Sequence, residues 1–210
     1  MVMLASAAVE SHAAQDEATA TQPATETVNK GWAFTGSAFG YLFFDGSGDY
    51  LQPTVSAQKG RLYFEGRYNY EERDTGSLFG GYQFSFGKEV TLDLTPMLGA
   101  VAGEIDGVAP ALELDLTWKS LNYYSESEYV FDFADRDENF FYAWSELSWQ
   151  CAPWFRTGLA LQRTRAYQTD REVEAGPLVG FYFWKMEIAT YLFSPFDDER
   201  FAVVAATIDF

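Results

Sequence analysis

The chain has 210 residues, of which 31 are acidic and 14 basic, so its net charge is −17. This balance argues against binding to nucleic acid, whose phosphates would be repelled. Cys151 is the single cysteine and cannot form an intramolecular disulfide, and the single histidine, His12, lies near the start of the chain. We therefore expect no Ser–His hydrolase, no zinc site and no cofactor. The sequence also lacks the glycine-rich turn between a strand and a helix that is typical of nucleotide-binding sites.

The N-terminal region is expected to lie outside the folded domain. Residues 1–14, MVMLASAAVESHAA, are small and apolar and predict a signal peptide, with cleavage before Ala14. A basic start is missing, which suggests that the true start lies upstream; the alternative is a short disordered N-terminus. Residues 15–30 have no apolar pattern and predict a disordered periplasmic tether.

From Gly31 onward, turn signals divide the chain into twelve segments. The expected strands are 31–44, 49–58, 60–71, 76–87, 89–103, 107–118, 120–133, 139–150, 153–167, 171–184, 186–194 and 200–210. Transmembrane strands run to about 9–11 residues, whereas strands in soluble proteins are most often about 5–6. The segment lengths therefore predict an all-β fold, a transmembrane antiparallel up-and-down β-barrel of twelve strands spanning residues 31–210.

The connections between these segments alternate in character. One set is acidic and longer, at 45–49, 71–76, 104–107, 134–138, 168–171 and 196–200, and the other is minimal, at 59–60, 87–88, 119–120, 151–153 and 184–186. Outer-membrane barrels have long extracellular loops and short periplasmic turns. The alternation predicts an even strand count with both chain termini in the periplasm.

Several segments alternate between apolar and polar residues. In one, Leu112 and Leu114 share a face opposite Glu113 and Asp115. Aromatic residues gather near the segment ends, which favours two girdles at the membrane interfaces; the alternative is an aromatic-rich soluble core, as in lipocalin-like barrels. Four prolines fall on the apolar face, where we expect bulges: Pro53, Pro96, Pro110 and Pro177.

The last segment, from Phe201 to Phe210, ends on an aromatic residue, with Ile208 and other small or apolar residues at alternate positions before it. It resembles the C-terminal strand of bacterial outer-membrane proteins. The resemblance implies a Gram-negative origin, location in the outer membrane and recognition of Phe210 and Ile208 by the barrel-assembly machinery. Strand number and length also look like those of the small monomeric twelve-stranded porins, such as the oligogalacturonate-channel family. That likeness is architectural, and no family motif matches residue by residue.

The inward-facing positions predict the nature of the lumen. They hold ten acidic residues against three basic ones, Arg61, Arg67 and Arg156. Because buried carboxylates need bases or water, this excess predicts a hydrated lumen. The alternative is a closed network in a narrow barrel, helped by bulky Phe79, Tyr124, Tyr142 and Trp144. The expected pore-lining residues are Glu65, Arg67, Asp93, Glu113, Asp115, Glu126, Glu128, Glu146, Arg156, Glu174 and Glu187.

These residues favour a monomeric, passive porin-like channel for small hydrophilic solutes, with a mild cation preference from its carboxylates. One alternative is a non-conducting structural or surface-interaction barrel, and a more distant one is an enzyme based on paired carboxylates such as Glu126 and Glu128. Arg163 and Arg165 fall on the lipid-facing side near the extracellular end, where they could bind lipopolysaccharide phosphates. A bulge near Gln162 would instead turn one of them inward.

Overall fold

The computed structural model describes residues 31–44, 48–166, 172–197 and 200–210. The expected signal peptide and tether, and the connection at 168–171, lie outside these ranges. The strands are β1 (Ala33–Phe43), β2 (Tyr50–Lys59), β3 (Leu62–Tyr68), β4 (Gly76–Tyr82), β5 (Phe84–Gly87), β6 (Val90–Ala102), β7 (Gly107–Trp118), β8 (Leu121–Asp132), β9 (Phe140–Ala152), β10 (Phe155–Ala166), β11 (Glu172–Phe183), β12 (Met186–Phe193) and β13 (Phe201–Asp209). A short 3₁₀ helix, η1, spans Arg136–Glu138. In the described ranges, no helix is long and apolar enough to cross a membrane.

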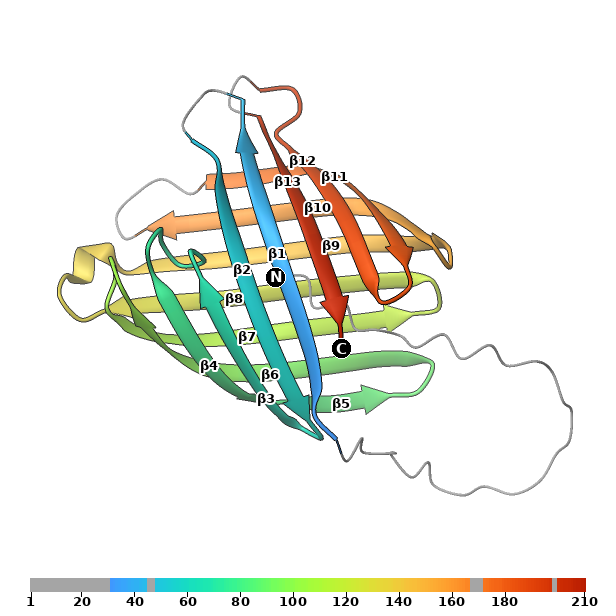
Figure 1. Cartoon of the computed structure of the whole chain (residues 1–210), viewed down its shortest axis with the longest axis horizontal. Helices are drawn as coiled ribbons and strands as arrows, with labels where there is room; N and C mark the ends of the chain where they lie inside the picture. The colour runs from blue at the N-terminus through green and yellow to red at the C-terminus, as the bar shows by residue number, and fades with distance from the viewer. Residues whose placement is uncertain (1–30, 45–47, 167–171, 198–199) are drawn as a thin grey trace, which may run out of the picture.

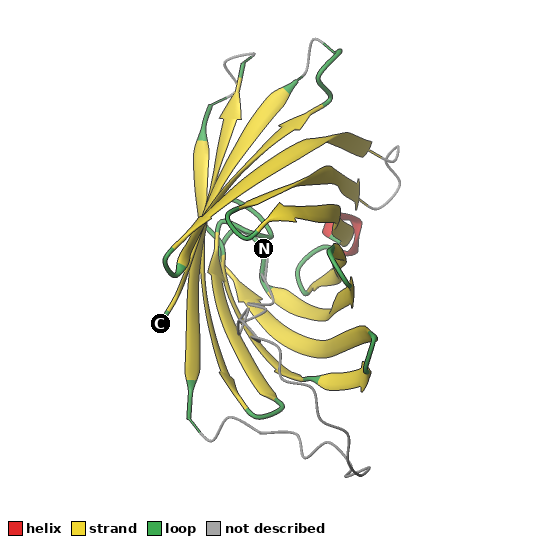
Figure 2. Ribbon diagram, turned by 90° about the vertical axis from the view of Figure 1, so that its right-hand side faces the viewer, coloured by secondary structure: helices red, strands yellow, loops and turns green. Residues whose placement is uncertain are grey.

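The strands form one closed antiparallel barrel, because the first and last strands pair with each other. β1 pairs with β2 on one side and with β13 on the other, where Thr35 lies opposite Asp209 and Phe43 opposite Phe201. In Figure 1, β1 and β2 cross steeply over β6 to β9 behind them, as the strand tilt of a barrel requires. Figure 2 shows the strands wrapping around a common interior.

Strands β4 and β5 are two parts of one strand. Both pair with β6 in the same register, Gly81 opposite Met97 and Phe84 opposite Leu94. The ladder is interrupted at Tyr82 and Gln83, which lie opposite Pro96 and Thr95, and Pro96 has no N–H to donate to it. Counting this pair as one, the barrel has twelve strands, and the predicted number is confirmed.

The bulges expected at the prolines are absent from the described strands. Pairing between β7 and β8 is interrupted at Pro110, but the register is the same before and after the interruption. The β2–β3 ladder begins one residue after Pro53, and the β11–β12 ladder one residue after Pro177. Each proline therefore removes hydrogen bonds on one side of its strand without adding a residue. The one register shift in these ladders is between Phe155 and Arg156.

The longer connections and the minimal turns lie at opposite ends of the barrel, as the alternation predicted. Two minimal turns contain residues with left-handed backbone, Lys119 (φ 55°) and Trp184 (φ 56°). The connection expected at 71–76 begins earlier, because Asn69 is also left-handed (φ 56°) and its side-chain oxygen accepts a hydrogen bond from the backbone N–H of Asp74 at 2.8 Å. As a result Tyr70, which the alternation places with the lipid-facing residues, turns toward the interior and packs in the core.

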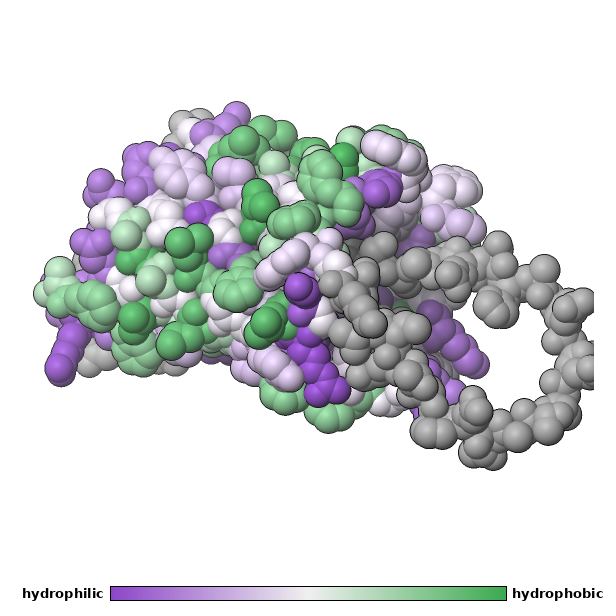
Figure 3. Space-filling view, turned by 60° about the horizontal axis from the view of Figure 1, so that its bottom comes forward, coloured by the Kyte–Doolittle hydropathy of each residue, from purple (hydrophilic) through white to green (hydrophobic). Residues whose placement is uncertain are grey.

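The outer wall is apolar, with aromatic residues at both ends. Leu78 and Leu98 are 73% and 63% exposed on its middle. Five of the six tryptophans are exposed at the end of the minimal turns, Trp32, Trp118, Trp149, Trp154 and Trp184, while Phe44, Phe131, Phe133 and Phe196 are exposed at the other end. Figure 3 shows apolar residues spread over the wall, with hydrophilic ones gathered at the left-hand end and others toward the right. Phe43 and Tyr50 lie near strand ends, where we expected girdle aromatics, but they pack inside the barrel.

Candidate functional site: the barrel interior

All eleven residues expected to line a pore lie at inward-facing strand positions. Eight of them form two buried networks, one around Arg67 and the other around Arg156, which we call the Arg67 network and the Arg156 network. The Arg67 network contains Glu65, Glu71, Glu113, Glu126 and Glu128, and the Arg156 network contains Glu146 and Glu187. The other three expected residues, Asp93, Asp115 and Glu174, are half-buried nearer the barrel ends.

Arg67, on β3, is surrounded by carboxylates from both sides of the lumen. Its guanidinium forms ion pairs with Glu65 on the same strand and with Glu126 on β8, and its Nη1 lies 2.9 Å from Oε2 of Glu128. The guanidinium also lies 4.3 Å from the ring centroid of Tyr70 and 4.2 Å from that of Phe79. This arginine therefore closes the lumen by joining β3 to β8.

Glu71 was not among the residues predicted from the sequence to line the lumen. It follows β3, and its Oε1 accepts a hydrogen bond from the hydroxyl of Ser77 at 2.5 Å and lies 3.9 Å from Nη1 of Arg67. Burial raises the pKa of Glu71, while the guanidinium of Arg67 opposes that rise. The sequence could have predicted this position, because Glu71 follows Glu65 and Arg67 at even spacings and so belongs to the same strand face. The left-handed Asn69, between Arg67 and Glu71, interrupts that strand.

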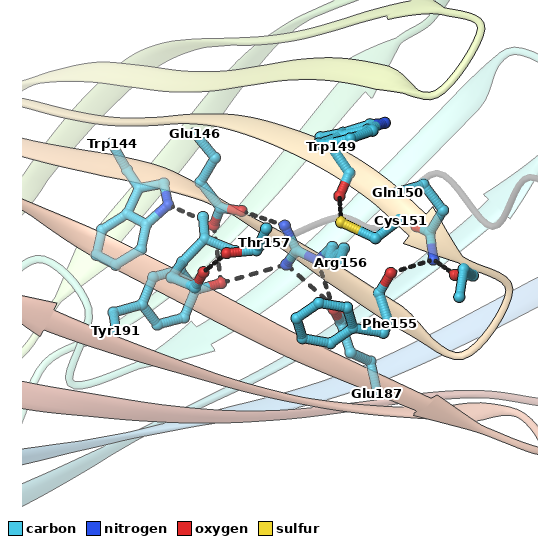
Figure 4. A network of polar contacts seen from close by, with 12 residues as sticks. Trp144, Glu146, Trp149, Gln150, Cys151, Phe155, Arg156, Thr157, Glu187 and Tyr191 are labelled. Atoms are coloured by element: carbon cyan, nitrogen blue, oxygen red, sulfur yellow. Dashed lines mark hydrogen bonds and ion pairs between the residues drawn. The ribbon is translucent and has the colours of Figure 1, made fainter.

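The Arg156 network joins β9, β10 and β12 (Figure 4). Nη1 of Arg156 lies 2.7 Å from Oε2 of Glu146, and its Nε lies 2.5 Å from Oε1 of Glu187. The second oxygen of Glu146 accepts hydrogen bonds from Nε1 of Trp144 and from the hydroxyl of Tyr191, both at 2.8 Å. Here neutral donors share the carboxylate charge with the guanidinium.

The half-buried acids stand nearer the openings. Asp93 and Asp115 lie directly opposite each other on β6 and β7, toward the minimal turns. Asp115 accepts hydrogen bonds from Asn122 at 2.9 Å and from Thr117 at 3.1 Å. Glu174 lies opposite Gln162, toward the longer connections. These acids keep contact with solvent, unlike those at mid-height.

The prediction that water must reach the inward carboxylates is wrong for the middle of the lumen. Glu65, Glu113, Glu126, Glu128, Glu146 and Glu187 are all between 0% and 4% exposed. Bulky neighbours fill the space, and Phe79, Tyr124 and Trp144 are themselves buried. The charges therefore form closed networks in a narrow barrel, which was the alternative prediction.

Aromatic residues fill the lumen between the Arg156 network and the longer connections. The ring centroids of Tyr41 and Tyr50 are 4.6 Å apart and nearly parallel. Phe201 stacks on Phe193 at 5.0 Å and on Phe43 at 5.1 Å. This packing closes that side of the interior with apolar surface.

Arg163 lies on the outer wall. The β9–β10 register is continuous from Arg156 to Ala166, so the bulge considered near Gln162 is absent, and Arg163 keeps the outward parity of Leu159 and Leu161. Its guanidinium lies 5.3 Å from the ring centroid of Phe141. Arg165 has the same strand parity, and its side chain lies outside the described part of the structure.

The interior offers carboxylates, hydroxyls and guanidiniums, and this set determines which ligands it could hold. Carboxylate oxygens from Glu65, Glu113 and Glu126 lie within 4.8 Å of one another, which is a possible site for a hard cation. The two arginines hold carboxylates already, and the described residues contain no histidine for acid–base chemistry.

The closed twelve-strand barrel, its apolar wall and its aromatic ends define the class: the chain has the fold of a bacterial outer-membrane β-barrel of the porin type. Among solved structures it is similar to the KdgM porin, alone and in complex with disordered oligogalacturonate, with a TM-score of 0.61, 9% identity and coverage of 84% of this chain and 99% of KdgM in each case. A weaker similarity, with a TM-score of 0.45 and 8% identity, covers 88% of this chain and 69% of OccK5 (OpdH) of Pseudomonas aeruginosa. No protein-family model and no curated protein matches the sequence.

Proposed function

We propose that the protein is an outer-membrane channel for small hydrophilic solutes, with a mild preference for cations, and that its lumen is closed at mid-height in the conformation described. The carrying observation is a polar wall along the lumen. On β2, Gln52, Thr54, Ser56 and Gln58 all face inward and lead past the Arg67 network. A barrel that served only as a scaffold could fill these positions with apolar residues at lower cost.

The charge of the interior supports a preference among solutes. Asp93, Asp115 and Glu174 remain partly accessible at the two ends, and carboxylates at a pore entrance favour cations. The KdgM porin is described in complex with oligogalacturonate, a polyanion. An acidic entrance would repel such a chain, so we propose neutral or cationic solutes here.

A second candidate function is a non-conducting structural barrel. The near-complete burial of both arginine networks favours it, because side chains without solvent access leave no continuous water path in this conformation. A carboxylate-based enzyme is disfavoured by the same burial, since Glu126 and Glu128 are held by Arg67 away from any substrate.

Planar-bilayer conductance of the purified protein separates the two candidates. We expect small, infrequent currents from the unmodified barrel and larger ones from Arg67→Gln or Arg156→Gln, since each change releases carboxylates that close the lumen. Arg163→Gln, the same change on the outer wall, is the matched control and should leave conductance unaltered. Silence from the unmodified barrel and from both lumen variants, when correctly folded, would show a structural barrel.

The same proposal includes a monomer with both termini in the periplasm and the longer connections outside the cell. This part of the proposal is supported by the pairing of the start of β1 with the end of β13, at the same end of the barrel as the minimal turns. There the backbone carbonyl of Phe34 accepts a hydrogen bond from the N–H of Phe210 at 2.9 Å. Phe210 lies against Gly36 on the outer wall, with Ile208 facing the same way. This placement leaves both side chains available to the barrel-assembly machinery.

Lipopolysaccharide is the proposed partner of Arg163 and Arg165. Replacing both arginines by Gln should lower the amount of lipopolysaccharide that purifies with the barrel and leave its conductance unchanged. Unchanged lipopolysaccharide content would remove these two residues from the proposal.

A further inference from the structure

The Arg67 network contains more negative charge than its arginine can neutralise. Four buried carboxylates form ion pairs with one guanidinium, those of Glu65, Glu71, Glu126 and Glu128, and a fifth, that of Glu113, lies beside Glu65 and Glu126. In the Arg156 network, by contrast, two carboxylates meet one guanidinium. Because an uncompensated buried charge costs several kcal/mol, the Arg67 network is expected either to bind a further positive charge or to keep some of its carboxyl groups protonated.

Three of these carboxylates converge on one point from three strands. Glu65 on β3, Glu113 on β7 and Glu126 on β8 each offer an oxygen, and these oxygens lie within 4.8 Å of one another. Calcium binds oxygen at about 2.3–2.6 Å, so two oxygens on one ion can be up to about 5 Å apart. The spacing therefore allows one Ca²⁺ to contact all three residues.

Glu113 supplies a second, independent observation that points to a ligand. It is 4% exposed, and its Oε1 has no hydrogen-bond partner within the described ranges. In the β7–β8 ladder it lies directly opposite Glu126, and like charges in that position destabilise a sheet. A buried carboxylate oxygen without a hydrogen-bond partner, on a residue whose carboxylate lies beside two others, is what a cation-binding site would present.

The neighbouring hydroxyls and Arg67 hold the other two carboxylates in place. Tyr63 donates its hydroxyl hydrogen bond to Oε2 of Glu65, and Tyr124 donates to Oε2 of Glu126 at 3.2 Å. Arg67 contacts Oε1 of both carboxylates. Since a carboxylate has about four acceptor positions, each can still bind a metal.

We propose that Glu65, Glu113 and Glu126 bind one hard divalent cation, Ca²⁺ in preference to Mg²⁺, as part of the folded barrel. All ligands are oxygens, and Mg²⁺ would require shorter contacts of about 2.0–2.1 Å with octahedral geometry. From the sequence we expected no metal site, because histidine and cysteine ligands are lacking. This lack excludes sites of the zinc type but not a site made of carboxylate oxygens. The proposal needs the barrel fold but not a conducting lumen.

The competing explanation is protonation, with Glu113 neutral and no ion present. The two explanations differ in what Glu113→Gln does. If an ion binds, the variant loses affinity for it; in chelator, however, the variant is at least as stable as the unmodified barrel, because a repulsive charge is gone. Glu128→Gln is the matched control, because Glu128 contacts Arg67 but lies outside the converging triad.

The experiment is to refold the full chain from denaturant into detergent with CaCl₂, with MgCl₂ or with EDTA at equal ionic strength. Bound calcium and the thermal unfolding midpoint are then measured. We expect one Ca²⁺ per barrel, a higher midpoint in calcium than in EDTA, at least tenfold weaker binding by Glu113→Gln and less than threefold change by Glu128→Gln. An unmodified barrel that binds no calcium, or whose midpoint is the same in calcium and EDTA, would overturn the proposal even if the variants fail to fold. An equal loss of calcium affinity in both variants would also overturn the proposal, because it would show that calcium is attracted by the overall negative charge of the lumen and not bound at one site.

Discussion

The Arg67 network and the Arg156 network each hold one buried arginine, but the ratio of carboxylates to guanidinium is much higher around Arg67. Arg156 is nearly matched, because two carboxylates meet one guanidinium, and Trp144 and Tyr191 donate hydrogen bonds to the remaining oxygen of Glu146. Arg67 has carboxylates in excess and has two aromatic rings beside its guanidinium. A total count of inward-facing charges therefore does not describe the lumen, because the acidic and basic side chains are distributed unequally between the two networks.

The largest expected effect separates the two arginines directly. Arg67→Met leaves the greater number of buried carboxylates without a base, so it should lower the free energy of unfolding by about 5 kcal/mol, against about 3 kcal/mol for Arg156→Met. Urea unfolding in detergent with EDTA measures both. A larger loss for Arg156→Met would break the comparison, because it would mean that the excess acids of the Arg67 network are already neutral.

An intermediate effect tests whether the Arg156 network is replaceable. Changing Arg156 to Met together with Glu146 and Glu187 to Leu removes every charge of the network at once. Apolar replacement of a whole buried ion cluster is often neutral or stabilising compared with the intact cluster, so the triple variant should regain at least the loss of about 3 kcal/mol expected for Arg156→Met. If the triple variant unfolds as easily as Arg156→Met, packing around Tyr191 and Trp144 and not charge sets the stability there.

The smallest effects come from removing a single carboxylate, and they should be larger in the Arg156 network than in the Arg67 network. Glu187→Gln removes one of the two partners of Arg156 and should cost about 1.5–3 kcal/mol, as expected for hydrogen bonds to a charged group. Glu71→Gln removes one of several acids near Arg67 and should change stability by no more than about 0.5 kcal/mol or increase it. The same urea series compares them, and equal losses would mean that the Arg67 network has no excess of charge.

The sequence predicts the barrel well, because a period of two residues is a local property of a strand. Glu113 and Leu112 have opposite environments in the structure for that reason alone. Strand length and the alternation of connections are also local. They predicted twelve strands, with the longer connections at one end of the barrel and the minimal turns at the other.

The interior chemistry could not be predicted, because it depends on contacts across the lumen. Arg67 meets Glu126 59 residues further along the chain, and the stagger of the strands decides that contact. Whether water reaches these groups depends on the volume of Phe79, Trp144 and their neighbours, which no pattern of polarity encodes. The inward turn of Tyr70 follows from one left-handed residue, Asn69.

The pairing of β1 with β13 has a kinetic consequence. Every other ladder joins strands that follow each other in the chain, whereas the hydrogen bond from Thr35 to Asp209 spans 174 residues. Hairpins form within microseconds, whereas closing a loop of this length costs about 3 kcal/mol more in chain entropy than closing a short turn, so we expect this pairing to come late. Until Phe201–Asp209 has docked, two strand edges stay open to other chains. A barrel shortened by this final strand should therefore accumulate as aggregates, however well its eleven remaining strands pair.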